Sequence, residues 1–389
     1  MKRLLGLISA GIMVLGVFSA PVAADDTVKV WTQNLYLGAD LTPVIEAAIK
    51  AKEENNPELF SVAAEAALKQ MGTNLFPLRA QRLATEIALY EPDLIALQEV
   101  ENIKVNDTNA GPPFVDYLQT LLNALALRGQ HYDVAAKVVN LDLIVPLTLD
   151  LNGDGVYDMV EVEVVDQDVI LVRNNVAFNK IAFSCDNYQS EDGCNYSTLA
   201  TLPSPLPVPA PQTIDIKRGF VGVDATVRGK RVFFVTTHLE QRELRSGHPE
   251  DAGIQSAQAG ELMGKLPAPL PGVPLILAGD FNSSSEDMGF DGIKPPYKII
   301  TDGIDGIPGF TDSWKRNPLA LLDPKGLTCC QNEYLDNKTS LLYERIDIVF
   351  IRGGKFLPWE FVTTRVPLIT PAPHWASDHG GVFAKLIFR

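Results

Sequence analysis

Short apolar runs rich in β-branched and aromatic residues recur along the whole chain. Each run is five to nine residues long, which is the pattern of buried or half-buried β-strands. The predicted strands are Val28–Leu35, Asp93–Val100, Tyr132–Val139, Val169–Arg173, Val221–Val227, Arg231–Leu239, Pro274–Phe281, Arg345–Ile351 and Val382–Phe388.

Other segments carry apolar residues at helical spacing, and proline stands near the start of several, where its missing N–H does no harm. Strands outnumber these helices, and some strands follow one another through tight turns such as Arg228-Gly229-Lys230. The pattern therefore predicts mixed sheets packed together with helices outside. The predicted helices are Pro43–Lys52, Pro57–Met71, Pro77–Tyr90, Phe114–Leu127 and Ala252–Leu266.

Two segments between predicted strands have the character of insertions, at about 140–168 and 184–217. The polar residues that suggest chemistry are scattered from Asn34 to His379. We therefore expect residues 25–389 to fold as one unit that brings them together.

The first 24 residues are typical of a secretory signal peptide, with a basic start at Lys2 and Arg3, an apolar run over Leu4–Phe18 and small residues at Val22-Ala23-Ala24. A transmembrane anchor is the alternative, but the apolar run is shorter than the ~20 residues that cross a bilayer. We expect a protein that is secreted to the extracellular space or periplasm, with no transmembrane segment in the mature chain.

The chain is acidic, and loss of Lys2 and Arg3 with the predicted signal peptide takes its formal net charge from −15 to −17. A surface of this sign does not attract polyanions through its mean field, but it suits a protein that concentrates divalent cations. Binding of a nucleic acid would need a local basic patch, because the sequence has no long run of Lys and Arg.

Four cysteines in an exported chain favour disulfide bonds. Cys185 and Cys194 close a short loop and are the favoured pair. Cys329 and Cys330 are adjacent, and either a bond between them or pairing elsewhere stays open.

One predicted insertion contains the full pattern of an EF-hand calcium loop, with oxygen donors in register and Gly155 at the sixth position. Its flanks are predicted strands, so the expectation is an EF-like loop in a β context with a structural Ca²⁺. A plain hairpin turn is the alternative. The expected ligands are Asp150, Asn152, Asp154, Val156, Asp158 and Glu161.

Acids, amides and imidazoles stand where apolar strands end or begin, and burying them there is costly unless they are paired or bind a metal. Each one alone has a structural explanation, as a cap, a turn or a core residue, but as a set they indicate one shared cleft. Carboxylate and amide oxygens suit Mg²⁺ or Mn²⁺. The set is Asn34, Glu99, His238, Asp280, Asn282, Asp347, Asp378 and His379.

These residues, in this order and with their neighbours, resemble the motifs of the endonuclease/exonuclease/phosphatase superfamily, and the likeness spans nearly the whole mature chain. The resemblance implies a four-layer α/β sandwich of two packed mixed β-sheets flanked by helices. The motifs are Asn34, Gln98-Glu99, Thr237-His238-Leu239, Gly279-Asp280-Phe281-Asn282, Arg345-Ile346-Asp347 and Ser377-Asp378-His379.

The resemblance also implies roles. Glu99 would be the principal Mg²⁺ (or Mn²⁺) ligand, with Asn34 and Asp378 nearby, whether the site holds one metal or two. Asp280 would orient or deprotonate the attacking water, and Asn282 would hold the phosphate or the nucleophile.

His379 would contact the phosphate and be oriented by Asp347, and His238 would contact the phosphate or protonate the leaving oxygen. The sequence leaves open which group is the general base and which is the general acid. Arg173, at the end of a predicted strand, is a candidate phosphate contact, because guanidinium binds phosphate with two hydrogen bonds.

The favoured function is a secreted, metal-dependent phosphodiesterase, with a nuclease as the favoured subtype and no obligate protein partner. A sphingomyelinase-like phospholipid phosphodiesterase and a phosphomonoesterase are the alternatives within the same chemistry. A calcium-stabilised extracellular binding protein without catalysis is the alternative from another class.

Overall fold

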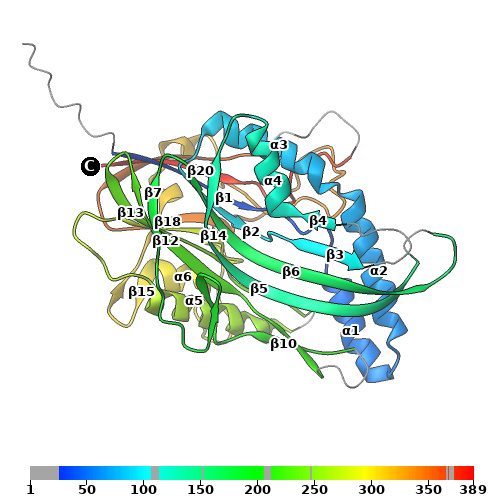
Figure 1. The fold of residues 1–389 in the computed structure, drawn as a ribbon. Helices are drawn as coiled ribbons and strands as arrows, with labels where there is room; N and C mark the ends of the chain where they lie inside the picture. Colours follow the sequence, from blue (N-terminus) through cyan, green and yellow to red (C-terminus); the bar gives the residue numbers. More distant parts are fainter. Residues whose placement is uncertain are drawn as a thin grey trace, which may run out of the picture.

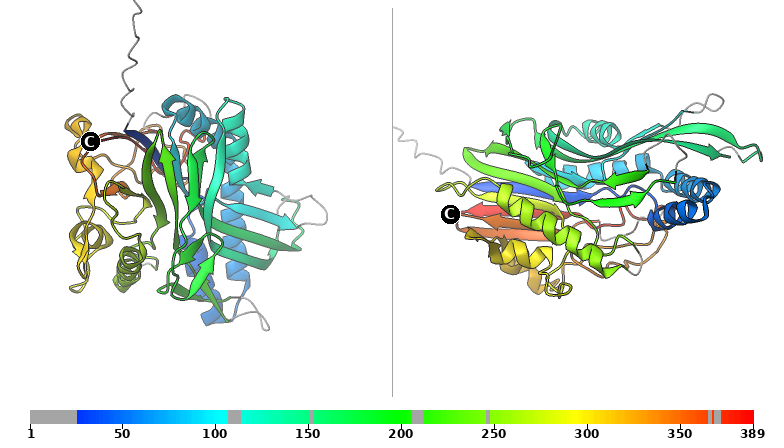
Figure 2. Two further views of the ribbon diagram at one scale, coloured as in Figure 1. Left: turned by 60° about the vertical axis from the view of Figure 1, so that its left-hand side comes forward. Right: turned by 90° about the horizontal axis from the view of Figure 1, so that it is seen from below.

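Two eight-stranded sheets pack face to face and form the centre of the molecule (Figure 1). The computed structural model describes residues 26–106, 114–150, 153–205, 212–245, 248–364, 367 and 372–389. Helices cover the outer face of each sheet, as the two further views in Figure 2 show. The four-layer α/β sandwich expected from the sequence is therefore confirmed.

The first sheet mixes parallel and antiparallel pairs, since β1 runs parallel to β2 and antiparallel to β20. Along the sheet, the strands are β19 (Phe356–Val362), β20 (Val382–Phe388), β1 (Thr27–Asn34), β2 (Leu94–Gln98), β6 (Asp158–Arg173), β3 (Asn102–Asn106) and β4 (Phe114–Asp116), with β5 (Tyr132–Leu149) also paired to β6.

The second sheet is also mixed, with β13 parallel to β14 and β18 antiparallel to β14. Its strands are β17 (Thr311–Asp312), β18 (Asp347–Arg352), β14 (Leu275–Asp280), β13 (Lys230–His238), β12 (Gly219–Val227), β9 (Gly193–Asn195) and β8 (Tyr188–Ser190), with β7 (Ala177–Lys180) paired to β12. Two small hairpins lie outside the sheets: β10 (Ala200–Pro203) with β11 (Thr213–Ile216), and β15 (Gly303–Ile304) with β16 (Ile307–Pro308).

The predicted helices all form, with one difference at the helix expected over Phe114–Leu127. Its first three residues pair with β3, and the Asp116 side chain then caps the helix by accepting the backbone N–H of Gln119 at 2.8 Å. The helices are α1 (Thr42–Glu54), α2 (Glu58–Thr73), α3 (Phe76–Tyr90), α4 (Tyr117–Ala126), α5 (Ala252–Lys265) and α6 (Pro296–Asp302), with 3-10 turns η1 (Pro249–Asp251), η2 (Ser313–Arg316) and η3 (Pro318–Leu321).

Alternation along the strands divides the apolar side chains between layers. Val28 and Val30 of β1 lie in the core between the sheets, whereas Trp31 belongs to the core beneath α3 and α4. A third core joins the second sheet to α5 and α6. Successive side chains of a strand point to opposite faces of the sheet. Each sheet therefore has one apolar face against the other sheet and one against helices.

The β5–β6 hairpin is much longer than the strands around it, and its register runs from Tyr132–Arg173 to Leu149–Asp158. Its outer half contains most of the segment predicted as an insertion at 140–168. The α1–α2 helix pair shares an apolar core with this outer half (Figure 1). Within the described residues, no helix has the length and apolar character needed to span a membrane.

Candidate active site

Strand ends from both sheets meet at one edge of the sandwich. Asn34 ends β1 opposite Gln98, the last residue of β2. In the other sheet His238 and Asp280 end the parallel strands β13 and β14, paired with each other. Asp347 begins the antiparallel strand β18 and pairs with Asp280. The scattered polar residues of the sequence therefore come together through sheet topology.

Glu99 is held directly after β2 by two hydrogen bonds. Its carboxylate accepts the Asn34 side-chain amide and the Leu37 backbone N–H, each at 2.8 Å. Glu99 has φ of 52°, and Asn282 has φ of 46°. These left-handed conformations are unfavourable for residues other than glycine and are typical of functional positions, where surrounding contacts fix them.

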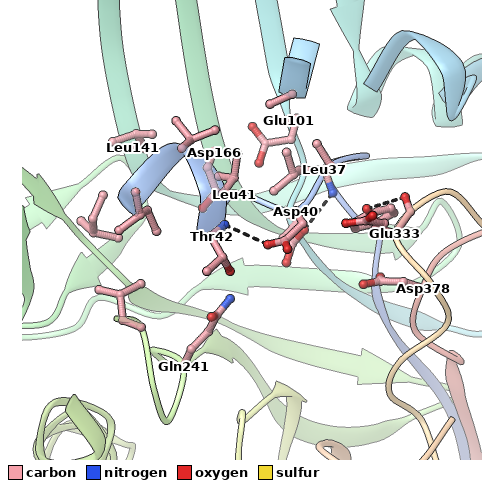
Figure 3. Close-up of a pocket in the computed structure, with 18 of the residues that line it drawn as sticks. Leu37, Asp40, Leu41, Thr42, Glu101, Leu141, Asp166, Gln241, Glu333 and Asp378 are labelled. Carbon is pink, nitrogen blue, oxygen red and sulfur yellow. Dashed lines mark hydrogen bonds between the residues drawn. The ribbon is translucent and has the colours of Figure 1, made fainter. Parts of the chain in front are cut away.

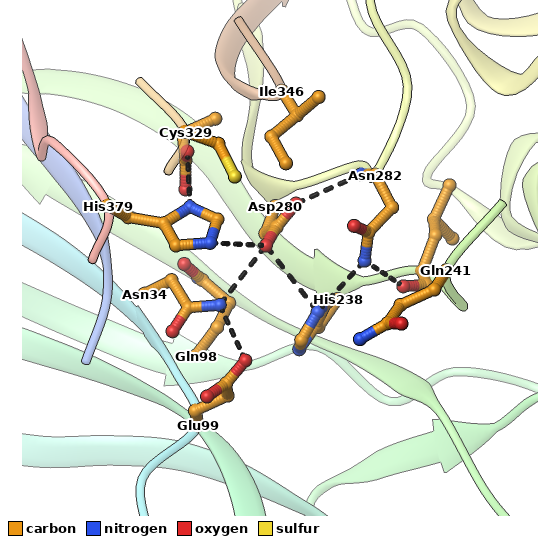
Figure 4. Close-up of polar contacts among 12 residues, drawn as sticks. Asn34, Gln98, Glu99, His238, Gln241, Asp280, Asn282, Cys329, Ile346 and His379 are labelled. Atoms are coloured by element: carbon orange, nitrogen blue, oxygen red, sulfur yellow. Dashed lines mark hydrogen bonds and ion pairs between the residues drawn. The ribbon is translucent and has the colours of Figure 1, made fainter. Parts of the chain in front are cut away.

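Asp280 lies at the centre of the polar contacts (Figure 4). Its carboxylate accepts the Asn34 side-chain amide at 3.1 Å and the Asn282 backbone N–H at 2.9 Å. The Nε2 atoms of His238 and His379 lie 3.5 and 3.9 Å from the same carboxylate. Burial first, and then the charge of neighbouring Asp347, raises the pKa of Asp280 to about 6.

His379 and Asp347 form a buried pair in which Nδ1 and Oδ2 are 2.8 Å apart. Burial alone would lower the pKa of His379, but the surrounding carboxylates, with Asp347 first among them, hold it well above its usual range. His379 is therefore a cation near neutral pH in the metal-free protein. The Oδ1 atom of Asp347 is buried without a hydrogen-bond partner.

His238 has the opposite state. Burial and the neighbouring Arg218 guanidinium, 3.1 Å from Nδ1, hold the pKa of His238 well below its usual range. Arg218 is itself held by Glu240, with 3.1 Å between the charged atoms. The site thus has one cationic and one neutral imidazole, and such separation marks groups with different roles in acid–base chemistry.

Asp378 completes the group. Ser377 hydrogen-bonds the Asn34 carbonyl at 2.7 Å, which ties the turn before β20 to the end of β1. Burial, more than any neighbour, raises the pKa of Asp378 to about 7. Buried carboxyl groups that lie close together and have raised pKa values favour binding of a cation, because the cation neutralises their mutual repulsion.

These residues fit a divalent metal ion. Asp280, Asp347 and His379 each offer one ligand atom, and the three atoms lie within 4.8 Å of one another. Glu99 and Asp378 add carboxylate oxygens beside this group, and hard oxygen donors are those that Mg²⁺ and Mn²⁺ prefer. Asn34 turns its amide N–H toward Glu99 and Asp280, while its oxygen accepts the Tyr36 backbone N–H at 2.8 Å. Six of the eight predicted residues also line or contact one cavity of about 760 Å³, namely Glu99, His238, Asp280, Asn282, Asp378 and His379.

A model of the Endonuclease/Exonuclease/phosphatase family matches residues 70–379, which include all but one of the residues assembled at this edge. The chain belongs to this family. No match is found among curated protein sequences.

Several solved structures are similar to the chain at low identity. A mannosyl-6-phosphatase from Bacteroides thetaiotaomicron is 15% identical with a TM-score of 0.48, covering 93% of this chain and 100% of that chain. TDP2 from Caenorhabditis elegans is 15% identical with a TM-score of 0.48, covering 93% and 75%. A family member from Beutenbergia cavernae is 18% identical with a TM-score of 0.47, covering 93% and 72%. Likeness at this level assigns no substrate.

Arg79 positions the loop that carries the first motif of this family member, and the sequence alone did not single it out. This buried guanidinium donates to the carbonyls of Leu35 at 2.6 Å, Tyr36 at 2.9 Å and Ala376 at 3.0 Å. A charged residue in line with Leu83 on the apolar face of a helix was the available signal.

A second group of buried acids lies next to Glu99 and was also missed. Burial raises the pKa values of Glu101 and Asp168 well above the usual range, and that of Asp166 to about 6. Acids inside an apolar strand such as β6 were the signal. Asp166 and Asp168 lie close enough to Arg218 for its charge to act on them. These acids add negative charge beside the candidate site.

Arg173, by contrast, is not brought to the site. It pairs with Glu91 at 3.1 Å, and its backbone N–H donates to the carbonyl of Asp93, at the start of β2. The β6 strand runs antiparallel to β2, so its end lies away from Glu99. The structure therefore places Arg173 away from the cluster that the sequence assigned it to, whereas Arg218 and Arg242 both line the cavity.

The predicted calcium loop is the tip of the β5–β6 hairpin, and the structure does not support calcium there. The Asp150 carboxylate accepts the backbone N–H groups of Gly153, Asp154 and Gly155 at 2.7 to 3.1 Å. Among the described residues of the loop, no three acidic ligand atoms come within 4.8 Å of one another. Of the predicted ligands, Asp154, Val156, Asp158 and Glu161 lie in the described part of the hairpin, and Asn152 lies outside the described residues.

The cysteine pair favoured from the sequence forms, and the two adjacent cysteines lie at the site. Cys185 is bonded to Cys194, with Cα atoms 5.4 Å apart. Cys329 and Cys330 lie together beside the site, with the Cys330 sulfur 4.0 Å from Nε2 of His379. The adjacent spacing gave no sign of this location.

Proposed function

We propose that the protein hydrolyses phosphodiesters by metal-assisted attack of water. The observation that carries the proposal is the buried Asp280–Asp347–His379 cluster, with Glu99 and Asn34 beside it. A divalent ion bound by the carboxylates of this group would neutralise phosphoryl oxygens and make water a better nucleophile, and His379 would stay free of the metal.

The chain's own residues supply positioning and proton transfer. Asp280 has a pKa of about 6, which suits a group that takes a proton from water near neutral pH. The His379 cation donates to a phosphoryl oxygen and is oriented by Asp347.

Asn282 and His238 lie on the other side of Asp280 from His379 and would contact the phosphate from there (Figure 4). Asn282 donates its side-chain amide to the carbonyl of Leu239 at 2.9 Å and lies 3.1 Å from Nε2 of His238. These contacts fix the amide at the cavity wall, where it reaches a phosphoryl oxygen. Neutral His238 then hydrogen-bonds the leaving oxygen. Within this proposal, the sequence favours a nuclease, and the phosphate-binding residues themselves do not distinguish a nucleic acid from another phosphodiester.

The test is hydrolysis of bis(p-nitrophenyl) phosphate with Mg²⁺ or Mn²⁺ and with chelator. Asp280→Asn should lower kcat by about 100-fold or more, because general acid–base catalysis contributes about 10²–10⁴. The matched control is Asp302→Asn, which removes an exposed acid paired with Lys294. Equal turnover in Asp280→Asn and wild type, with both proteins folded, would remove the proposal.

A further inference from the structure

The cavity at the candidate site continues well beyond the residues that chemistry requires (Figure 3). Besides the polar set, it is lined by apolar side chains from α1, α2, β5 and β6. We call this part the apolar arm and define it by Ile45, Phe60, Ala67, Leu141, Leu143 and Val164. Its volume together with the site is about 760 Å³, within the range of cavities that hold small ligands.

The apolar arm lies between β5 and α2, and the side-chain pattern of these two elements explains why it is open. On β5, Leu141 and Leu143 alternate with exposed Asp142 and Ile144, so the two leucines share the face that looks toward the helix pair. On α2, Ala67 stands on the buried face and presents only a methyl group to the cavity. The walls therefore meet incompletely and leave an opening.

Several arm residues are only half-buried, although they lie inside the molecule. Leu141, Leu143 and Ile45 each retain accessible surface while lining the cavity. Apolar surface that faces a water-filled cavity is unfavourable, and it becomes favourable when a hydrocarbon group displaces the water. The arm thus matches an uncharged, aliphatic occupant.

The charge of the side chains that line the cavity restricts the class of substrate further. Nine Asp and Glu side chains line the cavity, against the Lys and Arg side chains Lys217, Arg218 and Arg242 and the imidazolium of His379. Arg218 pairs with Glu240, and Arg242 pairs with Asp287 and Glu344. Tracking a long polyanion needs cations that are available to successive phosphates, and the lining offers a net negative field instead.

We propose that the substrate is an amphiphilic phosphodiester whose phosphate lies among the site residues and whose hydrocarbon chain lies in the apolar arm. This proposal rests on the proposed phosphodiesterase function and specifies its substrate class. The continuity of one cavity from Asp280 to Leu143 makes a single molecule able to occupy both parts.

The test is a series of p-nitrophenyl alkyl phosphates with methyl, butyl, octyl and dodecyl chains, each kept below its critical micelle concentration. The leaving group is constant, so only the chain changes. Each methylene that becomes fully buried should raise kcat/KM about fourfold, because it contributes about 0.8 kcal/mol. We expect at least a 100-fold rise from methyl to octyl, with much of it in KM.

Variants of α2 test whether the alkyl chain of the ester lies in the apolar arm. Ala67→Phe places a ring in the arm and should flatten the dependence on chain length while the methyl ester is turned over at the wild-type rate. Ala66→Phe makes the same change at the neighbouring exposed position and should behave as wild type. If Ala67→Phe does not fold, Leu141→Asn, with Asp142→Asn as its control, makes the same test from the β5 wall.

The outcomes separate the two proposals. If the methyl ester is hydrolysed and kcat/KM does not rise with chain length, the proposal of an amphiphilic substrate is overturned and the proposed phosphodiesterase function stands. An oligonucleotide hydrolysed with a higher kcat/KM than the octyl ester also overturns the amphiphile. Absence of metal-dependent turnover for every ester overturns the proposed function itself. Calorimetric titration of the metal-free protein with octyl methylphosphonate should show binding that Ala67→Phe abolishes.

Discussion

His379 is the residue whose state depends most directly on its neighbours. Its imidazole is buried, and only the nearby carboxylates keep the pKa above the usual range. A raised pKa means that the pairing stabilises the folded protein fully below about pH 6.5, and that this contribution is lost as pH rises through the folded value.

Replacing Asp347 with Asn should therefore lower the pKa of His379, because the carboxylate that raises it most is removed. The titration is followed by NMR of the histidine rings in metal-free protein, and exposed His248, paired with Glu250, serves as the internal reference. We also expect kcat to fall by about 100-fold, since the imidazole loses its orientation and charge. A His379 pKa unchanged by the substitution would contradict the assigned pairing.

Which predicted residues meet at the site depends on strand direction, which a single sequence does not show. Asn34 and Asp280 were predicted because they end apolar strands, and the parallel partners of those strands place them at one edge. Arg173 ends an equally apolar strand, but β6 runs the other way against β2. The same local signal therefore gave a correct and an incorrect placement.

At the scale of elements, α3 positions the site through a side chain that touches no substrate. Arg79 holds the carbonyls of Leu35, Tyr36 and Ala376, so both the loop after β1 and the turn before β20 depend on it. Removing a buried hydrogen-bonded charge leaves several buried carbonyls without partners.

Arg79→Met should therefore destabilise the protein by about 3 kcal/mol or more. It should also weaken metal binding, because Leu37 and Asn34 hold the Glu99 carboxylate. Urea denaturation and Mn²⁺ titration measure the two effects. Arg231→Met, which breaks a half-exposed pair with Asp224, should leave the free energy of unfolding close to that of wild type, because exposed ion pairs contribute little. Equal losses in the two variants would show that Arg79 has no special role.

Long, periodic elements could be predicted from the sequence, and short or interrupted ones could not. The helix over Pro77–Tyr90 follows directly from its apolar spacing. The α6 helix has seven residues, too few for a clear period. The β19 strand contains Pro358, which argues against a strand in the middle of a sheet, yet β19 is an edge strand, where a proline is tolerated.

At the scale of the whole molecule, crowded acids couple stability to metal and pH. Asp280 and Asp378 have pKa values of about 6 and 7 in the metal-free protein, well above those of free side chains. A carboxyl group with a raised pKa stabilises the fold while protonated, and this stability is lost as pH rises through the folded value.

Mg²⁺ should consequently raise Tm relative to chelator by an increment that grows between about pH 5 and about pH 8, reaching about 4 °C. Differential scanning fluorimetry with and without EDTA gives the increment directly and removes the general effect of net charge. Asp378→Asn should show a smaller increment with a weaker pH dependence. An increment that shrinks as pH rises would contradict the assignment of these acids to a cation.

The four-layer architecture could be predicted because it follows from local patterns and from family motifs spread over the chain. The apolar arm could not, because its walls belong to α1, α2 and the β5–β6 hairpin, and no pairwise spacing tells how far such walls stand apart. The segment at 140–168 was predicted as an insertion with short strands beside its loop, whereas it forms the outer half of two continuous strands.

The most direct test of the account measures Mn²⁺ occupancy by electron paramagnetic resonance and hydrolysis of bis(p-nitrophenyl) phosphate in the same samples. We predict that turnover rises in proportion to bound Mn²⁺, and that Glu99→Gln loses both while its circular dichroism spectrum is unchanged. Turnover that persists in chelator-treated protein, or a folded Glu99→Gln variant that binds Mn²⁺ and hydrolyses the ester like wild type, would contradict it.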